Sequence, residues 1–294
     1  MAETQPQIHD IYDRIFKKIL TLSSTAIINL INGLFKTNYP LDSTVSYNWT
    51  EFHNDNMKKI LADTIITING CYSYHLEAQM TNDNEIIFRV FEYSFYHAMR
   101  GIQAASNELI FPEPMIIYLY YEGIVPDEYD LVLNFGPQGT FHYKAKVLKF
   151  LDVTLDELNS NKMVILIPFQ LLKLRKILKK ERSQVTLDML KSLITNDIIG
   201  SVNKNLELGN ITKEDARRLK RLSLRLYNHL YSHYEEMKEL NEMTDESLML
   251  DIDIIEKEHE EQIAQIVAEK DKQLAERDEQ IKRLQEELER LKNN

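Results

Sequence analysis

Cysteine, glycine and long apolar runs are scarce in this sequence of 294 residues. Cys71 is the one cysteine, which excludes an internal disulfide and a thiolate metal cage and is typical of a reducing, cytoplasmic compartment. With 8 glycines and no G-x-G-x-x-G or Walker A loop, the sequence disfavours dinucleotide-binding and P-loop enzymes. Its apolar runs are shorter than the roughly 18 residues of a membrane span, and its first residues lack the features of a secretory signal, so we expect no membrane attachment.

Acidic residues outnumber basic ones, and the excess is uneven along the chain. The formal net charge is −11, of which residues 251–294, with 14 acids and 8 bases, carry −6. This balance argues against a histone-like polyanion binder, but the body of the chain has two basic segments, one around Arg175 and one around Arg218. Each segment is either a set of phosphate contacts or the solvated face of a helix.

The first part of the chain changes from a helical period to a strand period. Apolar residues recur at three- and four-residue spacing over 8–36, which predicts two helices separated at Ser23-Ser24. Residues 59–68 and 72–80 then read as strands joined by Asn69-Gly70, a strong hairpin turn signal. In the second strand, polar residues occupy every other position and therefore share one face.

The rest of the body alternates again and then becomes helical. Residues 85–109 have a helical period that ends before Pro112, and residues 169–240 read as helices, with Thr212 as the N-cap of one of them. Between these helical stretches we expect four strands, at 115–121, 130–135, 143–150 and 163–167. The order predicts an α/β fold over residues 1–180 and a helical extension over 181–248.

Residues 249–294 have a heptad pattern. The first seam position is apolar throughout, with Val267, Leu274, Ile281 and Leu288, whereas the second contains Ile263, Lys270, Arg277, Leu284 and Leu291. Such a repeat predicts a coiled coil of moderate strength that forms a homodimer or binds another chain. The alternative is a single solvated helix with ion pairs between residues four apart.

Asp63, Glu77 and Gln79 are the most informative polar residues. Asp63 lies on the first strand of the predicted hairpin, and Glu77 and Gln79 share one face of the second. Two carboxylates on adjacent strands can converge on an oxygen-ligated cation such as Mg²⁺, which activates water and stabilises charge on a phosphodiester. Spacing alone favours a plainer interpretation, the solvent face of a strand pair.

Four stretches of residues 10–180 together resemble a known family. They are the D-x-x-F-K motif that begins at Asp13, Leu61-Ala62-Asp63, Leu76-Glu77-Ala78-Gln79-Met80, and Phe88-Arg89-Val90-Phe91-Glu92-Tyr93. The combination is similar to the PD-(D/E)XK nuclease superfamily, in its recombination-promoting nuclease/putative transposase branch. The resemblance implies a restriction-endonuclease-like mixed sheet flanked by helices, and a DNA endonuclease that depends on Mg²⁺ or Mn²⁺.

The resemblance also assigns roles to individual residues. It makes Asp63 and Glu77 the metal ligands, and it places Gln79 where many relatives carry lysine and Asp13 at a helical acidic position that adds a metal or water contact. Arg89 and Tyr93 would contact DNA phosphate or brace Glu77. Lys17, Arg175 and Lys176 complete the expected contacts to double-stranded DNA.

The glutamine at position 79 leaves two functions open. A neutral amide can orient a water molecule but brings no positive charge to the leaving phosphate. The first interpretation is a metal-dependent DNA endonuclease that promotes recombination or DNA mobility and whose dimer places two sites on one duplex. The second is an inactive nuclease core that binds DNA or serves as a scaffold, which an Arg89 side chain lying at the metal position would favour.

Overall fold

The computed structural model describes residues 9–48, 51–53, 59–61, 64–101, 107–180 and 184–231. The chain divides into two units, Met1–His233 and Tyr234–Asn294, and every described residue belongs to the first. The boundary expected at residue 180 lies inside that first unit, and the predicted coiled coil lies outside the described residues. Within the described ranges, no helix has the length and apolarity needed to span a membrane.

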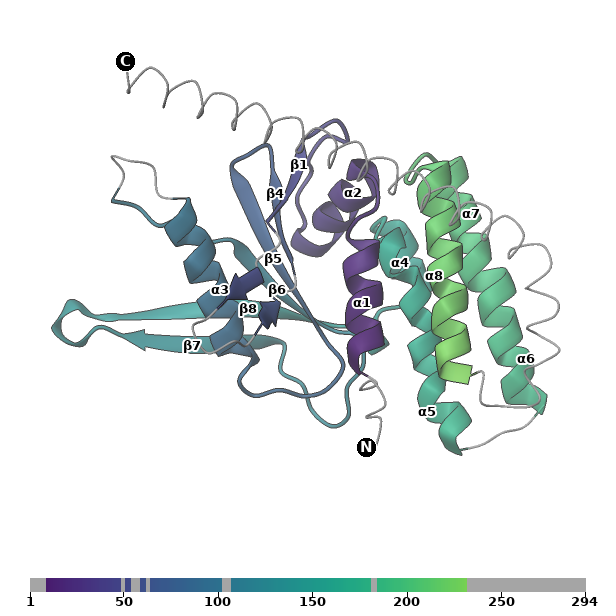
Figure 1. Cartoon of the computed structure of the whole chain (residues 1–294). Helices are drawn as coiled ribbons and strands as arrows, with labels where there is room; N and C mark the ends of the chain where they lie inside the picture. Colours follow the sequence, from purple (N-terminus) through teal and green to yellow (C-terminus); the bar gives the residue numbers. More distant parts are fainter. Residues whose placement is uncertain are drawn as a thin grey trace, which may run out of the picture. The chain divides into compact units, whose positions relative to one another are not determined.

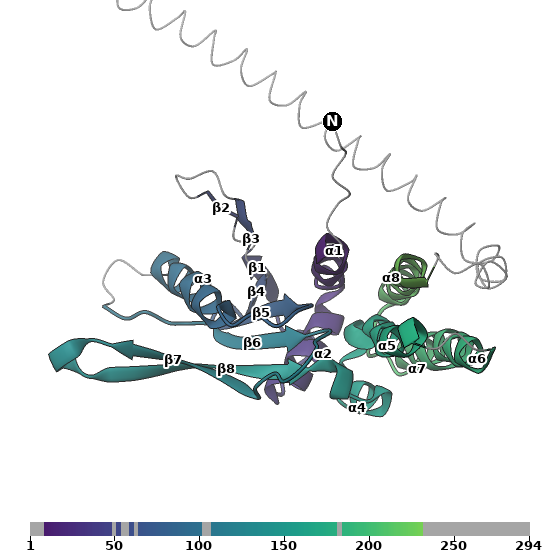
Figure 2. The ribbon, with the colours of Figure 1, turned by 90° about the horizontal axis from the view of Figure 1, so that it is seen from below.

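Six of the described strands form one open, mixed sheet. In sheet order they are β1 (Val45–Asn48), β4 (Thr64–Ile68), β5 (Tyr72–Gln79), β6 (Glu113–Tyr118), β8 (Thr140–Lys149) and β7 (Glu128–Asn134). The pairs β1–β4, β4–β5 and β7–β8 are antiparallel, whereas β5–β6 and β6–β8 are parallel. Two short strands, β2 (Glu51–His53) and β3 (Lys59–Leu61), pair separately. The mixed sheet confirms the predicted α/β class, and its β7–β8 hairpin extends beyond the other strands (Figures 1 and 2).

The hairpin between β4 and β5 forms as its sequence predicts. Asn69 and Gly70 have φ angles of 52° and 68°, the left-handed values that a tight two-residue turn needs at both central positions. The Asn69 side-chain oxygen accepts a hydrogen bond from the Thr44 N–H at 3.0 Å. This turn fixes the register in which Thr64 pairs with Leu76.

Helices cover both faces of β5. Tyr74 lies with its ring 4.5 Å from that of Phe35, in α2 (Ser24–Phe35), whereas the next residue, His75, contacts Ser94 of α3 (Ile86–Arg100). Since successive strand residues point to opposite faces, α2 and α3 lie on opposite sides of the sheet. Figure 2 shows α3 along one side of the strands, and under it lies an apolar core that includes Val90, Ile116 and Ala145.

The remaining helices lie together beside the sheet (Figure 1). They are α1 (His9–Ile19), α4 (Leu155–Ser160), α5 (Leu172–Lys180), α6 (Gln184–Ser192), α7 (Ile199–Glu207) and α8 (Lys213–Tyr231). A π-helical segment, η4 (Leu193–Ile198), joins α6 to α7, and short 3₁₀ segments occur at η1 (Gly136–Gln138) and η2 (Phe150–Asp152). The helices before and after residue 180 therefore form one group.

The break predicted at Ser23-Ser24 and the cap predicted at Thr212 are confirmed, and Asp215 connects them. Asp215 accepts hydrogen bonds from the backbone and side chain of Thr212, at 2.9 and 2.8 Å, and from the backbone and side chain of Ser23, at 2.8 and 2.5 Å. Ser23 is the N-cap of α2, so one buried carboxylate serves the starts of both α2 and α8.

The strand predicted at 163–167 is wrong, because Met163 directly precedes a 3₁₀ helix, η3 (Val164–Leu171), and the other four residues belong to it. Every residue of η3 is buried, and η3 packs against α2, α4, α5, α7 and α8. A short run that is apolar at every position has the same sequence pattern in a buried strand as in a buried helix. Its surroundings decide its conformation here, since helices enclose it.

Candidate active site

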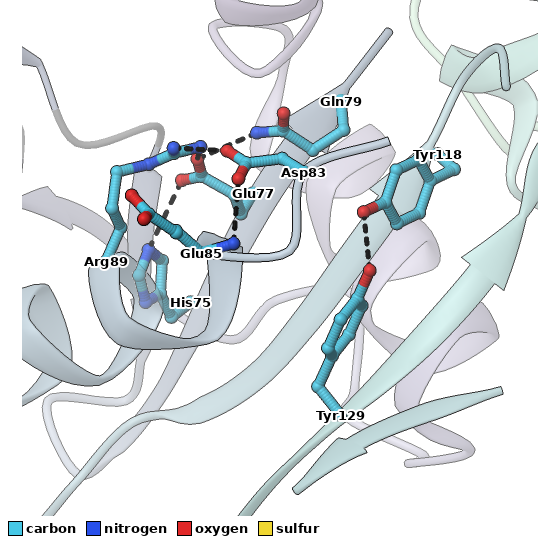
Figure 3. A network of polar contacts seen from close by, with 8 residues as sticks. All are labelled: His75, Glu77, Gln79, Asp83, Glu85, Arg89, Tyr118 and Tyr129. Carbon is cyan, nitrogen blue, oxygen red and sulfur yellow. Dashed lines mark hydrogen bonds and ion pairs between the residues drawn. The ribbon is translucent and has the colours of Figure 1, made fainter. Parts of the chain in front are cut away.

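Polar side chains of β5 face α3 in a row of paired contacts. Nearest the hairpin turn, Ser73 lies 3.2 Å from Nε2 of His97. Next, Nδ1 of His75 lies 3.1 Å from the Ser94 hydroxyl, which also accepts a hydrogen bond from Tyr143 at 3.0 Å. The row ends at Glu77, where the strand approaches the first turn of α3 (Figure 3). The alternation predicted for this strand therefore brings its polar face into contact with a helix.

Glu77 is the centre of a cluster of charged and amide groups. The residue is buried, with 5% of its surface exposed, and its Oε1 accepts hydrogen bonds from Gln79 Nε2 at 3.0 Å and from Arg89 Nη2 at 3.3 Å. The other terminal nitrogen of Arg89, Nη1, donates to Asp83 Oδ2 at 2.5 Å. The guanidinium thus bridges two carboxylates, one from β5 and one from the turn that precedes α3 (Figure 3).

The turn between β5 and α3 brings Asp83 to this position. Asp83 Oδ1 accepts a hydrogen bond from the backbone N–H of Glu85 at 2.8 Å, which ties the side chain to the start of the helix. Arg89 is the fourth residue of α3 and reaches back over that first turn. A short polar turn followed by a helix is therefore sufficient to place a carboxylate and a guanidinium beside Glu77.

The electrostatics keep Arg89 charged and His75 neutral. Burial has the largest effect on the pKa of Arg89 and lowers it, but Glu77 and Asp83 together raise that pKa above its ordinary value. Burial lowers the pKa of His75 to about 4, and the charge of His97 contributes. Nε2 of His75 lies 3.9 Å from Glu77 Oε2, so a neutral imidazole lies beneath the carboxylate.

Tyr118, on β6, lies next to Gln79 in the sheet. Its Cα pairs with that of Gln79 across β5 and β6, and its hydroxyl lies 2.8 Å from that of Tyr129 on β7 (Figure 3). Burial, together with the hydrogen bond to Tyr129, raises the pKa of Tyr118. Tyr118 is therefore a neutral phenol beside this end of β5. The charged groups of the cluster are Glu77, Asp83 and Arg89.

The donor set fits a hard divalent cation in its chemistry. Carboxylate oxygens are ligands that Mg²⁺ and Mn²⁺ accept, and Glu77 and Asp83 supply them on the two sides of the Arg89 guanidinium, whereas Gln79 turns its Nε2 donor towards Glu77. Among the described residues there is no group of three or more His, Cys, Asp or Glu side chains that could hold a metal. A divalent cation at Glu77 would also meet Arg89, which already supplies positive charge there.

Of the residues expected at this site, the structure brings Glu77, Gln79 and Arg89 together. Asp63 lies outside the described residues, so its pairing with Glu77 stays a prediction. Asp13 lies in α1 and Lys176 in α5, with side chains outside the described part of the structure. Lys17 is half-buried in the last turn of α1.

Two of the residues expected to contact DNA lie against rings of other residues in the protein. Tyr93 is 4% exposed and its ring lies 6.1 Å from that of His75, so it braces the interface between β5 and α3. Arg175 lies over the rings of Tyr120 and Tyr12, at 5.1 and 5.9 Å from their centroids. Of the two roles that the resemblance gives Tyr93, its burial favours bracing the site. Arg175 has aromatic partners within the protein, and the contact of either residue with DNA stays a prediction.

The basic segment around Arg218 also has an internal role. Arg218 donates to the backbone carbonyl of Thr21 at 2.9 Å and to its hydroxyl at 2.7 Å. The side chain thus connects α8 to the turn after α1. Neither alternative considered for this segment, a phosphate contact or a purely solvated face, included such an internal contact.

Two residues of the site were missed in the sequence. Asp83 belongs to the polar turn Thr81-Asn82-Asp83-Asn84, which reads as an ordinary loop, and the spacing of six residues to Arg89 has no meaning until the turn folds back. His75 shares the strand face of Glu77, and that alternation was the available signal. Its burial, however, depends on α3 and cannot be seen in the strand pattern alone.

Comparisons with known proteins return no match: no protein-family model, no curated protein and no solved structure is significantly similar to this chain.

Proposed function

We propose that this protein is a metal-dependent DNA endonuclease with a restriction-endonuclease-like fold. The observation that carries the proposal is the position of Glu77 and Gln79 at the end of an inner strand of a mixed sheet, directly before a helix that presents Arg89 to them. The resemblance in the sequence assigns these same residues to the reaction centre. Helices on both faces of the sheet agree with the fold that the resemblance implies.

The register of the hairpin supports Asp63 as the second metal ligand. Asp63 directly precedes Thr64 in the sequence, and Thr64 pairs with Leu76, the residue before Glu77. In this proposal Asp63 and Glu77 hold the cation, which when bound activates a water molecule and stabilises charge on the phosphodiester. Gln79 orients the water through its amide. Arg89 supplies the positive charge towards the phosphate that the amide of Gln79 lacks.

Plasmid cleavage by the full chain tests the proposal. We expect nicking or cutting with Mg²⁺ or Mn²⁺, none with EDTA, and a loss of about 100-fold or more in Asp63→Ala and Glu77→Gln, because even partners outside the coordination shell cost 10–100-fold. Asp130→Asn is the matched control, since Asp130 is an exposed carboxylate that contacts His142 on the β7–β8 hairpin. Cleavage that is unchanged in Glu77→Gln would contradict the proposal.

A non-catalytic DNA-binding or scaffold protein is the second candidate, and one observation favours it. Arg89 already forms ion pairs with both Glu77 and Asp83, as expected for a nuclease core that has lost its metal. In this case the purified chain retards DNA on a gel at low salt but cleaves it with neither metal. Retardation should then fall steeply with added salt, because the contacts are mainly to phosphate.

A further inference from the structure

We infer that Arg89 is an internal counter-ion that holds the place of the divalent cation at Glu77, and that the cation binds when the guanidinium shifts wholly onto Asp83. The inference rests on the proposed function, because it concerns the same carboxylate. It adds Arg89 as a group that competes with the cation, and Asp83 as the carboxylate that receives Arg89. A metal site as such requires neither. The geometry of three side chains carries it (Figure 3).

The first step is that Glu77 needs a positive partner. With 5% of its surface exposed, its carboxylate has little access to water, and an isolated buried charge is strongly unfavourable. Arg89 meets that need through one hydrogen bond to Oε1 at 3.3 Å, and Gln79 adds a neutral donor to the same oxygen. A divalent cation bound by Glu77 would meet the same need, so the two positive groups compete for one carboxylate.

The second step is that Arg89 has another site within reach. Its contact with Asp83 is the shorter of its two ion pairs, at 2.5 Å against 3.3 Å for Glu77. Side-chain exposure rises from 6% at Glu77 to 26% at Asp83 and 39% at Arg89, so solvent lies on the Asp83 side. Leaving Glu77 therefore costs Arg89 one hydrogen bond and moves it towards water.

The third step is that Asp83 is held in place. Its Oδ1 accepts from the Glu85 N–H, whereas Oδ2 accepts from Arg89, so the carboxylate is fixed at the start of the same helix that carries Arg89. The receptor and the arginine thus keep their relative position while the contact with Glu77 opens. Asp83 acts through Arg89 and is a positioning residue in this scheme.

The scheme predicts opposite effects for two substitutions. Removing the charge of Arg89 removes the competitor, so Arg89→Gln should bind Mn²⁺ more tightly, by about 5- to 150-fold if the coupling is of ordinary size. Asp83→Asn removes the charge that attracts Arg89 away from Glu77, so it should bind Mn²⁺ more weakly. In the double variant the Asp83 substitution should have no further effect, because its partner is absent.

Isothermal titration calorimetry of the full chain with MnCl₂ tests the scheme, with Arg100→Gln as a control for loss of one arginine from α3. Unchanged or weaker binding in Arg89→Gln, together with loss of binding in Glu77→Gln, would overturn the inference and leave the nuclease site intact. Equal binding in the wild type, Arg89→Gln and Glu77→Gln would instead remove Glu77 as a ligand, and with it both the proposed function and the inference.

A second readout covers a folding defect in Arg89→Gln. In EDTA this variant should unfold at a lower temperature than the wild type, since Glu77 loses its counter-ion, and Mn²⁺ should raise its Tm more than that of the wild type. Adding Glu77→Gln should restore the Tm in EDTA. If Arg89→Gln does not fold at all, Asp83→Asn alone tests the inference. Mn²⁺ binding by Asp83→Asn that is equal to or tighter than binding by the wild type would then overturn the inference.

Discussion

The lowered pKa of His75 arises mainly from its burial between β5 and α3, and the charge of His97 adds to the effect. It is fully buried, its Nδ1 lies beside the Ser94 hydroxyl, and its ring lies next to Tyr93. A neutral imidazole fits this environment, and a protonated one would be buried between the strand and the helix. Protonation is therefore coupled to unfolding at this residue.

This coupling gives a pH dependence with a definite sign. The unfolded chain binds a proton at the ordinary histidine pKa of 6.5, whereas the folded protein does so only near a pKa of about 4. The contribution of His75 to the free energy of unfolding is fully present above pH 6.5. It falls by about 3 kcal/mol as the pH is lowered to 4. Urea unfolding in EDTA at pH 7 and pH 4.5 measures the loss, which His75→Gln should reduce.

His142→Gln is the matched control, because His142 is exposed on the β7–β8 hairpin and contacts Asp130. It should leave the pH dependence as steep as in the wild type. Part of the slope should survive in His75→Gln, since burial, together with Arg100, also lowers the pKa of His97. An identical slope in His75→Gln and the wild type would show that His75 does not control acid stability.

Among the elements, α2 depends on a close approach at Gly33. A Cβ atom at this position would lie 2.6 Å from the Asn161 carbonyl oxygen and 2.4 Å from Cγ of Met163. The methionine can move, but the backbone oxygen is held by the turn that leads into η3. The contact between α2 and the start of η3 therefore requires a residue without a side chain.

Gly33→Ala should destabilise the protein by about 1–3 kcal/mol, the usual range for overpacking in a core. Chemical denaturation with urea measures the change. Gly200→Ala is the control within α7, where a Cβ meets nothing within 4 Å, and it should stabilise by about 0.5–1 kcal/mol because alanine favours helix. Equal stability of Gly33→Ala and the wild type would mean that α2 moves away from η3 at little cost.

The elements differ in how far their own sequence determines their conformation, and the reasons are physical. The β4–β5 hairpin was predictable because Asn69-Gly70 and strict alternation each specify local geometry. The segment at 163–167 was not, because its conformation depends on the helices around it. Glu77 and Gln79 became candidates because they share one strand face, and the resemblance then assigned their roles. The ion pair between Arg89 and Asp83 depends on the conformation of the turn between β5 and α3, which the spacing of residues in the sequence does not predict.

At the scale of the whole molecule, the heptads in residues 249–294 predict association. We expect the full chain to have a mass in solution of about twice the 34.6 kDa of one chain, because an apolar seam of this kind is stable only when paired. Light scattering after size-exclusion chromatography measures it. Leu274→Glu with Ile281→Glu should give the mass of one chain, whereas Gln273→Glu, off the seam, should not. A monomeric wild-type chain would remove the argument for two sites on one duplex.

The π-helical segment between α6 and α7 has a consequence for length variation among homologous sequences. A π turn closes its hydrogen bonds over one residue more than an α turn, so η4 accommodates an inserted residue without interrupting the helix. A deletion or insertion within α7 would instead turn the following residues by about 100° and remove Val202 and Asn205 from the core. Single-residue gaps in an alignment should therefore fall within residues 193–198, where a change of helix type absorbs them.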